Sequence, residues 1–329
     1  MTPYDTLVRA AKSLRDTALL SDWGSVEIIQ ARHWVEQNGD VLNAVRRTLA
    51  RKCSVPLRCD ASFFEPHCED VAHLRNIARA FALDLRVAED VGDWASATRI
   101  GVDTLELANA LQRGGLISDL LVSIALSGVA LEQLRKLRTR LDGARRSALI
   151  SDLERLERER DVVWDIMERD RQWELAAGLS DAICDSRSLE LSDGIERGLT
   201  QDDRQIVSDV IRSYQGYCDS EQTRSVTCVD QDNSIVALMR MLAIDLAIRS
   251  YHAIHYAYPT DICVLAPYFS VRLPLDPFTE EPFLYRRLAE GSFVVYSTGP
   301  TRVDHGGIFG PWSMVAAGEV DLCLDVNDY

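Results

Sequence analysis

Prolines are distributed very unevenly along this chain of 329 residues. No proline occurs between Pro66 and Pro259, whereas seven of the ten prolines lie from residue 259 onward. Because proline disrupts a helix interior, a long proline-free stretch with apolar residues at i, i+3 and i+4 indicates a series of helices. The proline-rich end instead indicates turns and short strands. The sequence therefore predicts a mainly α chain: irregular helical hairpins, then a small α+β module with a short antiparallel sheet.

The expected organisation has three parts. Residues 1–177 form a helical-hairpin domain, residues 178–233 form a polar helical connection, and residues 234–329 form the α+β module. The pattern predicts helices over residues 3–20, 23–38, 40–53, 67–91, 94–112, 116–141 and 144–177. Asn38-Gly39 is expected to end the second of these helices.

Residues 74–111, "LRNIARAFALDLRVAEDVGDWASATRIGVDTLELANAL", carry the clearest hairpin pattern. One apolar stripe includes Leu74, Ile77 and Phe81, and a second begins at Trp94 after the turn. Small side chains at Ala97 and Gly101 allow two antiparallel helices to approach closely. This segment resembles a tetratricopeptide-type helix pair, whose "GDxxxA" turn is here "GDWASA". The helical part also resembles the helical regions of planctomycete-type envelope proteins.

The C-terminal part predicts a helix followed by a β-hairpin. The helix has Asn233 or Ser234 as its cap and ends at Tyr258-Pro259. "PFLYRR" and "SFVVYS" are expected to be two strands joined by a turn at Gly291, and "VDLCLDV" from residue 320 to 326 is a possible third strand.

Several motifs in this part follow a recognisable order. A long helix, "YPT", "LPLDPFTEEPFLYRR", "FVVYSTGP" and "DHGG" follow one another over residues 234–329. This order resembles the globular domain of the major pseudopilin of type II secretion systems. The resemblance implies an α+β module with a calcium-binding last loop, for which Asp304 and Asp321 are the remaining candidate ligands. The apolar fibre-forming helix of that family has no counterpart here, so a filament role is not expected.

The turn in "LPLDPFTEEPFLYRR" holds a glutamate where the resembling loops have glycine. Asp276-Pro277 starts the turn, and Glu280 occupies the glycine position. A glutamate with positive φ costs on the order of 1 kcal/mol. We therefore expect either a strained Glu280 or a reshaped turn.

Two other groups of side chains are candidate metal ligands. His252 and His255 have the i, i+3 spacing that places them on one side of a helix. A second group of cysteines and histidines falls within 21 residues: Cys53, Cys59, His67, Cys68 and His73. The eight cysteines include no CxxC pair, which argues against a zinc ribbon. A Cys53–Cys59 disulfide and buried free thiols are the alternatives to a metal.

The charge balance excludes some partners. A formal charge of −15 and a pI near 4.9 argue against binding nucleic acid or anionic lipid, which require a basic surface. No uninterrupted run of about 18 apolar residues occurs, so direct membrane contact is not expected. The first thirty residues predict an amphipathic helix and not a signal peptide. An anchor upstream would place the chain outside the cytoplasm, and without one a cytoplasmic location is expected.

Known catalytic motifs do not assign a reaction. The sequence contains no GxSxG elbow and no phosphate-binding loop with its lysine, so no catalytic or cofactor-binding residue is assigned. The first hypothesis is a non-enzymatic binding or scaffolding protein with a protein partner, in an envelope or secretion setting that only the resemblance implies. The alternative is a metal-dependent hydrolase with its site between the helical domain and the module, using His252, His255 or the Cys53–His73 group. A plain structural subunit is a third reading, and the oligomeric state stays open.

Overall fold

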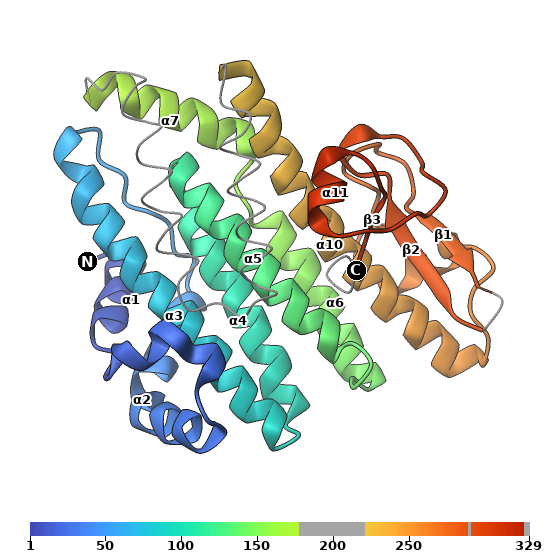
Figure 1. The fold of residues 1–329 in the computed structure, drawn as a ribbon, viewed down its shortest axis with the longest axis horizontal. Coiled ribbons are helices and arrows are strands. Elements are labelled where there is room, and N and C mark those ends of the chain that lie inside the picture. The colour runs from blue at the N-terminus through green and yellow to red at the C-terminus, as the bar shows by residue number, and fades with distance from the viewer. Residues whose placement is uncertain (178–220, 289–290, 326–329) are drawn as a thin grey trace. The chain divides into compact units, whose positions relative to one another are not determined.

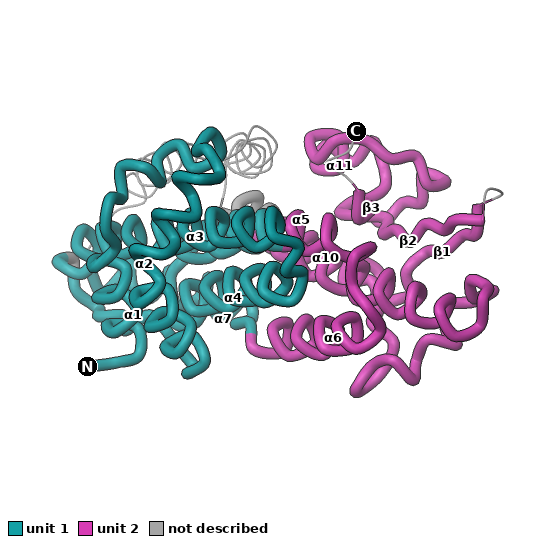
Figure 2. The backbone as a smooth tube through the Cα atoms, turned by 90° about the horizontal axis from the view of Figure 1, so that it is seen from below, with its two compact units in different colours: residues 1–130, 160–212 teal, residues 131–159, 213–329 magenta. Residues whose placement is uncertain are grey.

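The protein is mainly helical and has a small three-stranded antiparallel sheet near its C-terminus, which confirms the predicted fold class (Figure 1). The computed structural model describes residues 1–177, 221–288 and 291–325. Two compact units share the chain (Figure 2). Unit 1 is formed by residues 1–130 and 160–212, and unit 2 by residues 131–159 and 213–329.

Unit 1 is built from helices that pack along one another in pairs. Its described elements are α1 (Pro3–Lys12), η1 (Thr17–Ser25), α2 (Ile28–Leu49), η2 (Ala61–Phe63), α3 (Phe64–Asp90), α4 (Trp94–Gln112), the first part of α5 (Ile117–Leu137) and α7 (Val163–Ala177). The core lies between these helices and includes Leu7, Trp34, Phe81 and Leu107, each at most 2% exposed.

The pairing of α3 with α4 confirms the predicted hairpin. Gly92 has φ of 72°, which ends α3, and the carboxylate of Asp93 accepts the Ser96 N–H at 3.0 Å as the N-cap of α4. Ala97 is completely buried at the contact between the two helices. The sequence therefore contained enough local information to define both helices and their turn.

The expected break at Asn38-Gly39 is wrong, because α2 runs through it from Ile28 to Leu49. The side chain of Asn38 is fully buried and accepts the backbone N–H of Arg15 at 2.8 Å. Its amide also donates to the Trp34 carbonyl at 3.0 Å. Asn38 thus joins α2 to the segment after α1 and does not end a helix. That segment departs from the helix predicted over residues 3–20, because Asp16 has φ of 51° and α1 ends at Lys12.

The single helix expected over residues 144–177 is also wrong. The structure has α6 (Gly143–Arg158) and α7, with a break between them. The carboxylate of Asp161 accepts the Gly114 N–H and an Arg169 guanidinium N–H, both at 2.9 Å. These contacts draw the chain toward the turn that precedes α5, so a tertiary polar interaction overrides helix continuation.

Unit 2 combines helices with the sheet. Its described elements are the end of α5, α6, α10 (Glu221–His255), η3 (Ile262–Tyr268), β1 (Leu284–Arg287), β2 (Phe293–Ser297), η4 (Gly299–Thr301), α11 (Trp312–Ala317) and β3 (Leu322–Cys323). Helix α6, which the sequence grouping placed with the N-terminal helices, packs on α10.

Helix α10 begins at Glu221, so the predicted start and cap at Asn233 or Ser234 are wrong. The Ser234 hydroxyl instead donates to the Asp230 carbonyl at 2.8 Å, as in a helix interior. The part of the predicted polar connection that precedes residue 221 lies outside the described residues.

The sheet has the order β1-β2-β3 and is antiparallel throughout. Leu284 pairs with Tyr296 and Arg287 with Phe293, so the predicted hairpin is confirmed. Gly291 has φ of 73° in its turn. The third strand is only two residues long, and Tyr296 pairs with its Cys323.

Helix α5 has the length and composition of a membrane span, although polar residues interrupt its apolar sequence. In its most apolar window, 78% of the residues are buried inside the protein. Such burial is typical of the core helix of a folded domain.

The turn before β1 takes one of the two forms expected from the sequence, that with a strained Glu280. Leu275 and Pro282 form an isolated antiparallel bridge, and the Asp276 N–H donates to the Glu281 carbonyl at 2.8 Å. The Asp276 carboxylate accepts the Phe278 N–H at 3.0 Å. Closing the turn in this way leaves Glu280 with φ of 60°, in the left-handed region that favours glycine.

Replacing this residue by glycine tests the strain. We expect Glu280→Gly to raise the free energy of unfolding by about 0.5–1 kcal/mol, because glycine adopts positive φ without a Cβ clash. Urea denaturation measures the change. Glu281→Gly is the matched control, because Glu281 does not have positive φ, and it should be neutral or destabilising. An equal gain from both substitutions would contradict backbone strain at Glu280.

Candidate functional site

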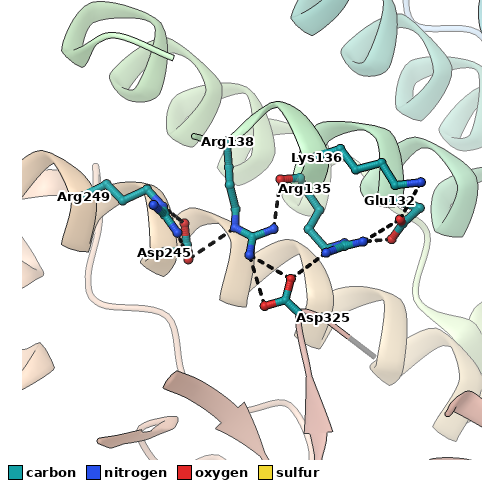
Figure 3. Close-up of polar contacts among 7 residues, drawn as sticks. All are labelled: Glu132, Arg135, Lys136, Arg138, Asp245, Arg249 and Asp325. Atoms are coloured by element: carbon teal, nitrogen blue, oxygen red, sulfur yellow. Dashed lines mark hydrogen bonds and ion pairs between the residues drawn. The ribbon is translucent and has the colours of Figure 1, made fainter. Parts of the chain in front are cut away.

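The most extensive charged group in unit 2 joins three segments that are far apart in the sequence (Figure 3). The end of α5 and the residues after it supply four side chains, α10 supplies two, and one follows β3. We call this group the Asp325 cluster, and its members are Glu132, Arg135, Lys136, Arg138, Asp245, Arg249 and Asp325.

Asp325 lies between two guanidinium groups. Arg135 Nη1 contacts Asp325 Oδ1 at 2.6 Å, and Arg138 Nη2 contacts the same oxygen at 2.7 Å and Oδ2 at 3.1 Å. Each arginine has a second acidic neighbour: Glu132 accepts two N–H groups of Arg135 at 2.9 and 2.7 Å, and Asp245 lies 3.6 Å from Arg138 Nε. The residues after β3 are therefore tied to both α5 and α10.

The cluster is partly buried and its charges are nearly balanced. The side chains of Arg135 and Glu132 are 6% and 4% exposed, whereas Asp325 is 42% exposed. Arg249 donates to Asp245 at 2.5 Å, and although burial opposes its charge, this partner raises the pKa of Arg249 above its ordinary value. Buried charges are tolerated when they are paired in this way, so the cluster is an internal contact that joins the three segments.

The two predicted calcium ligands, Asp304 between η4 and α11 and Asp321 directly before β3, both accept backbone N–H groups. Asp321 is fully buried and accepts the His305 N–H at 3.1 Å and the Gly307 N–H at 2.8 Å, one on each oxygen. Asp304 Oδ1 accepts the Gly306 N–H at 2.7 Å and the Tyr296 hydroxyl at 3.3 Å. The carboxylates thus organise the loop internally, and this arrangement does not fit a calcium site.

His252 and His255 contact different aromatic rings. The His252 ring stacks on Tyr258 at 4.4 Å between centroids, and the His255 ring lies 4.1 Å from that of Tyr251. Tyr258 in turn contacts Phe293 of β2 at 5.0 Å. The two histidines therefore belong to the packing at the end of α10. Among the described residues, no group of three or more His, Cys, Asp and Glu side chains could hold a metal ion.

The Cys53–His73 group is also dispersed. Cys53 is a buried thiol 3.4 Å from the Thr48 carbonyl, whereas Cys59 is exposed, and the structure joins them by no disulfide. His67 Nε2 lies 2.7 Å from Asp119 Oδ1, and both side chains are at most 3% exposed. Phe63 stacks on His67 at 4.8 Å between ring centroids. Cys184 and Cys218 lie outside the described residues.

Strand β1 presents a second kind of surface. Within the described residues it pairs with β2 on one side, and no strand pairs with its other edge (Figure 1). Arg286, Arg287 and Leu288 at its end are exposed. Arg286 lies over the Tyr296 ring at 5.3 Å and donates to the Gly306 carbonyl at 2.6 Å. Gly307 has φ of 71°, which favours glycine, and a Cβ there would have to displace the Arg286 guanidinium. Unlike the carboxylates above, the backbone groups along this edge are not paired with another strand among the described residues.

Sequence reasoning missed the Asp325 cluster and the His67–Asp119 pair. Arg135 and Asp325 are separated by 190 residues, and His67 and Asp119 by 52. No local spacing signals such contacts, because they depend on how distant elements pack.

Comparison with known proteins gave no match: no family model, no curated protein and no solved structure is significantly similar to the chain. The resemblances to pseudopilins and to tetratricopeptide helix pairs therefore remain predictions.

Removing the Asp325 carboxylate tests the anchoring role. We expect Asp325→Asn to lower the free energy of unfolding by about 1–3 kcal/mol, because Arg135 and Arg138 lose a charged acceptor. Hydrogen exchange should become faster at β2 and β3. The control is Asp152→Asn, which removes an exposed helical pair with Arg155 and should cost less than about 0.5 kcal/mol. Equal effects of the two substitutions would argue against the anchor.

The His67–Asp119 pair predicts a pH dependence of stability. Burial opposes the imidazolium charge, but Asp119 overcomes this effect and raises the pKa of His67 above its ordinary value of 6.5. The stabilisation is therefore complete below about pH 6.5 and is lost as the pH rises through the raised pKa. Urea denaturation between pH 5 and 9 should show this decline. His67→Gln should flatten the decline, whereas His33→Gln at an exposed position should leave it unchanged.

Proposed function

We propose that the chain is a non-enzymatic protein-binding component and that it binds its partner through the open edge of β1. The observation that carries the proposal is that no strand of the described residues pairs with this edge, and that Arg286, Arg287 and Leu288 at the end of β1 are exposed. An exposed strand edge offers unpaired backbone groups, which another chain can use.

The internal use of the other polar groups supports a binding role. The carboxylates of Asp321, Asp325 and Asp119 each accept hydrogen bonds from groups of their own unit. They hold a loop, a strand end and a helix start in place. A catalytic acid or base must instead reach the substrate's proton. An envelope or secretion setting is part of the proposal only through the pseudopilin resemblance.

Site-specific photo-crosslinking in the native host tests the proposal. A photoreactive amino acid at Leu288, which is 47% exposed beside the edge, should give a discrete adduct with one protein. The same substitution at Ile29, 78% exposed in unit 1, is the control and should give none. The adduct should form again with the purified partner and disappear when unlabelled protein competes. No adduct at Leu288, or identical adducts at both positions, would contradict the proposal.

A further inference from the structure

The backbone of β1 has a defined set of groups facing its open edge. The Leu288 N–H donates to the Ser292 carbonyl at 2.9 Å, and this pair continues the register in which Arg286 opposes Val294. In an antiparallel ladder, hydrogen-bonded pairs alternate with non-bonded ones. The N–H and C=O groups of Leu284, Arg286 and Leu288 therefore face β2, and those of Tyr285 and Arg287 face the open edge.

The two arginines of β1 flank this edge from opposite faces of the sheet. Successive side chains of a strand point to opposite faces, and Arg286 lies on the face of the Tyr296 ring. Arg287 lies on the other face, which it shares with its neighbour Phe293. In the part of the chain that the structure describes, no ion pair joins Arg287 to an acidic residue. Each face of the sheet beside the open edge thus carries one arginine, and both residues are exposed.

We propose that an extended acidic segment of a partner protein adds to β1 as a further strand. Two adjacent acidic residues of the segment pair with Arg286 and Arg287, because side chains of the added strand also alternate between the faces. The inference rests on the proposed function, since it names the chemistry of the partner at the same edge.

The charge distribution favours an acidic occupant. The chain carries a net charge of −15, so two adjacent exposed arginines on an open edge are a local exception. The bridge between Leu275 and Pro282 covers the strand's beginning and limits the available edge to about five residues. An added strand of this length belongs to the weak and transient class of contacts, in which electrostatic complementarity gives specificity. A strand end with charged residues can also serve only to prevent aggregation, and the experiment separates these two roles.

The spacing of acidic residues in a peptide probe tests the geometry. Fluorescence anisotropy with the full-length protein compares three labelled Val- and Thr-rich peptides: one with two adjacent glutamates, one with the two glutamates at i, i+2, and one with two adjacent lysines. The adjacent pair should bind about two- to fivefold more tightly than the i, i+2 pair, which reaches only one face of the sheet. The lysine peptide should not bind.

Two substitutions at one position separate charge from strand addition. Arg287→Gln removes the charge, keeps the N–H, and should weaken binding of the adjacent-glutamate peptide about two- to fivefold. Arg287→Pro also removes the N–H that faces the open edge and should weaken binding about fivefold further. The ladder to β2 is kept, because position 287 does not donate to it. Circular dichroism checks whether each variant is folded. The peptide-spacing and Arg287→Gln results test the geometry even where Arg287→Pro fails to fold.

Several outcomes would overturn the inference. They are equal affinity for the two glutamate spacings, no effect of Arg287→Gln, or equal binding by Arg287→Pro and Arg287→Gln. A single-stranded oligonucleotide that binds as tightly as the acidic peptide would show a general anion site. A specific crosslinked partner at Leu288 without acidic-peptide binding would overturn this inference and leave the proposed function standing. Absence of both would overturn both.

Discussion

The pairing of Asp325 with Arg135 and Arg138 is the interaction on which the arrangement of unit 2 depends. A buried or half-buried arginine requires an anion nearby, and two such arginines converge on one carboxylate at 2.6 and 2.7 Å. This requirement fixes the residues after β3 to the end of α5. Because β3 pairs with β2 and β2 with β1, the same contact positions the whole hairpin. The position of the open edge of β1 therefore depends on ion pairs at the opposite edge of the sheet, beside β3.

Local sequence patterns predicted those elements whose boundaries depend on nearby residues. Helices α3 and α4 end and begin at Gly92-Asp93, where a glycine with positive φ and an aspartate cap act within one turn. The β1–β2 hairpin and the positive φ of Glu280 were also predictable, because turn chemistry is local. The mainly helical class followed from the absence of proline over nearly 200 residues.

The remaining boundaries depend on contacts that sequence spacing does not reveal. Asn38 would be a helix terminator in isolation, but a buried contact with the Arg15 backbone keeps it inside α2. Asp161 interrupts a continuous helical pattern because it bonds to Gly114. The roles of the candidate ligands were likewise not visible in the sequence. Asp304 and Asp321 lie in the predicted region, but their carboxylates accept backbone N–H groups. The open side of β1 became visible only when the strand order was known.

The division of the units along the chain has a consequence for biosynthesis. Arg135, in unit 2, meets its partner Asp325 only after 190 further residues have been made, and part of unit 1 lies between them. At a translation rate of about 5–20 residues per second, this interval lasts on the order of ten to forty seconds. The end of α5 lacks Asp325 throughout this time, and α6 lacks its neighbour α10 until His255 has been made. Unit 2 therefore cannot be completed until the last residues are made, whereas a protein whose domains follow one another in sequence completes each domain in turn.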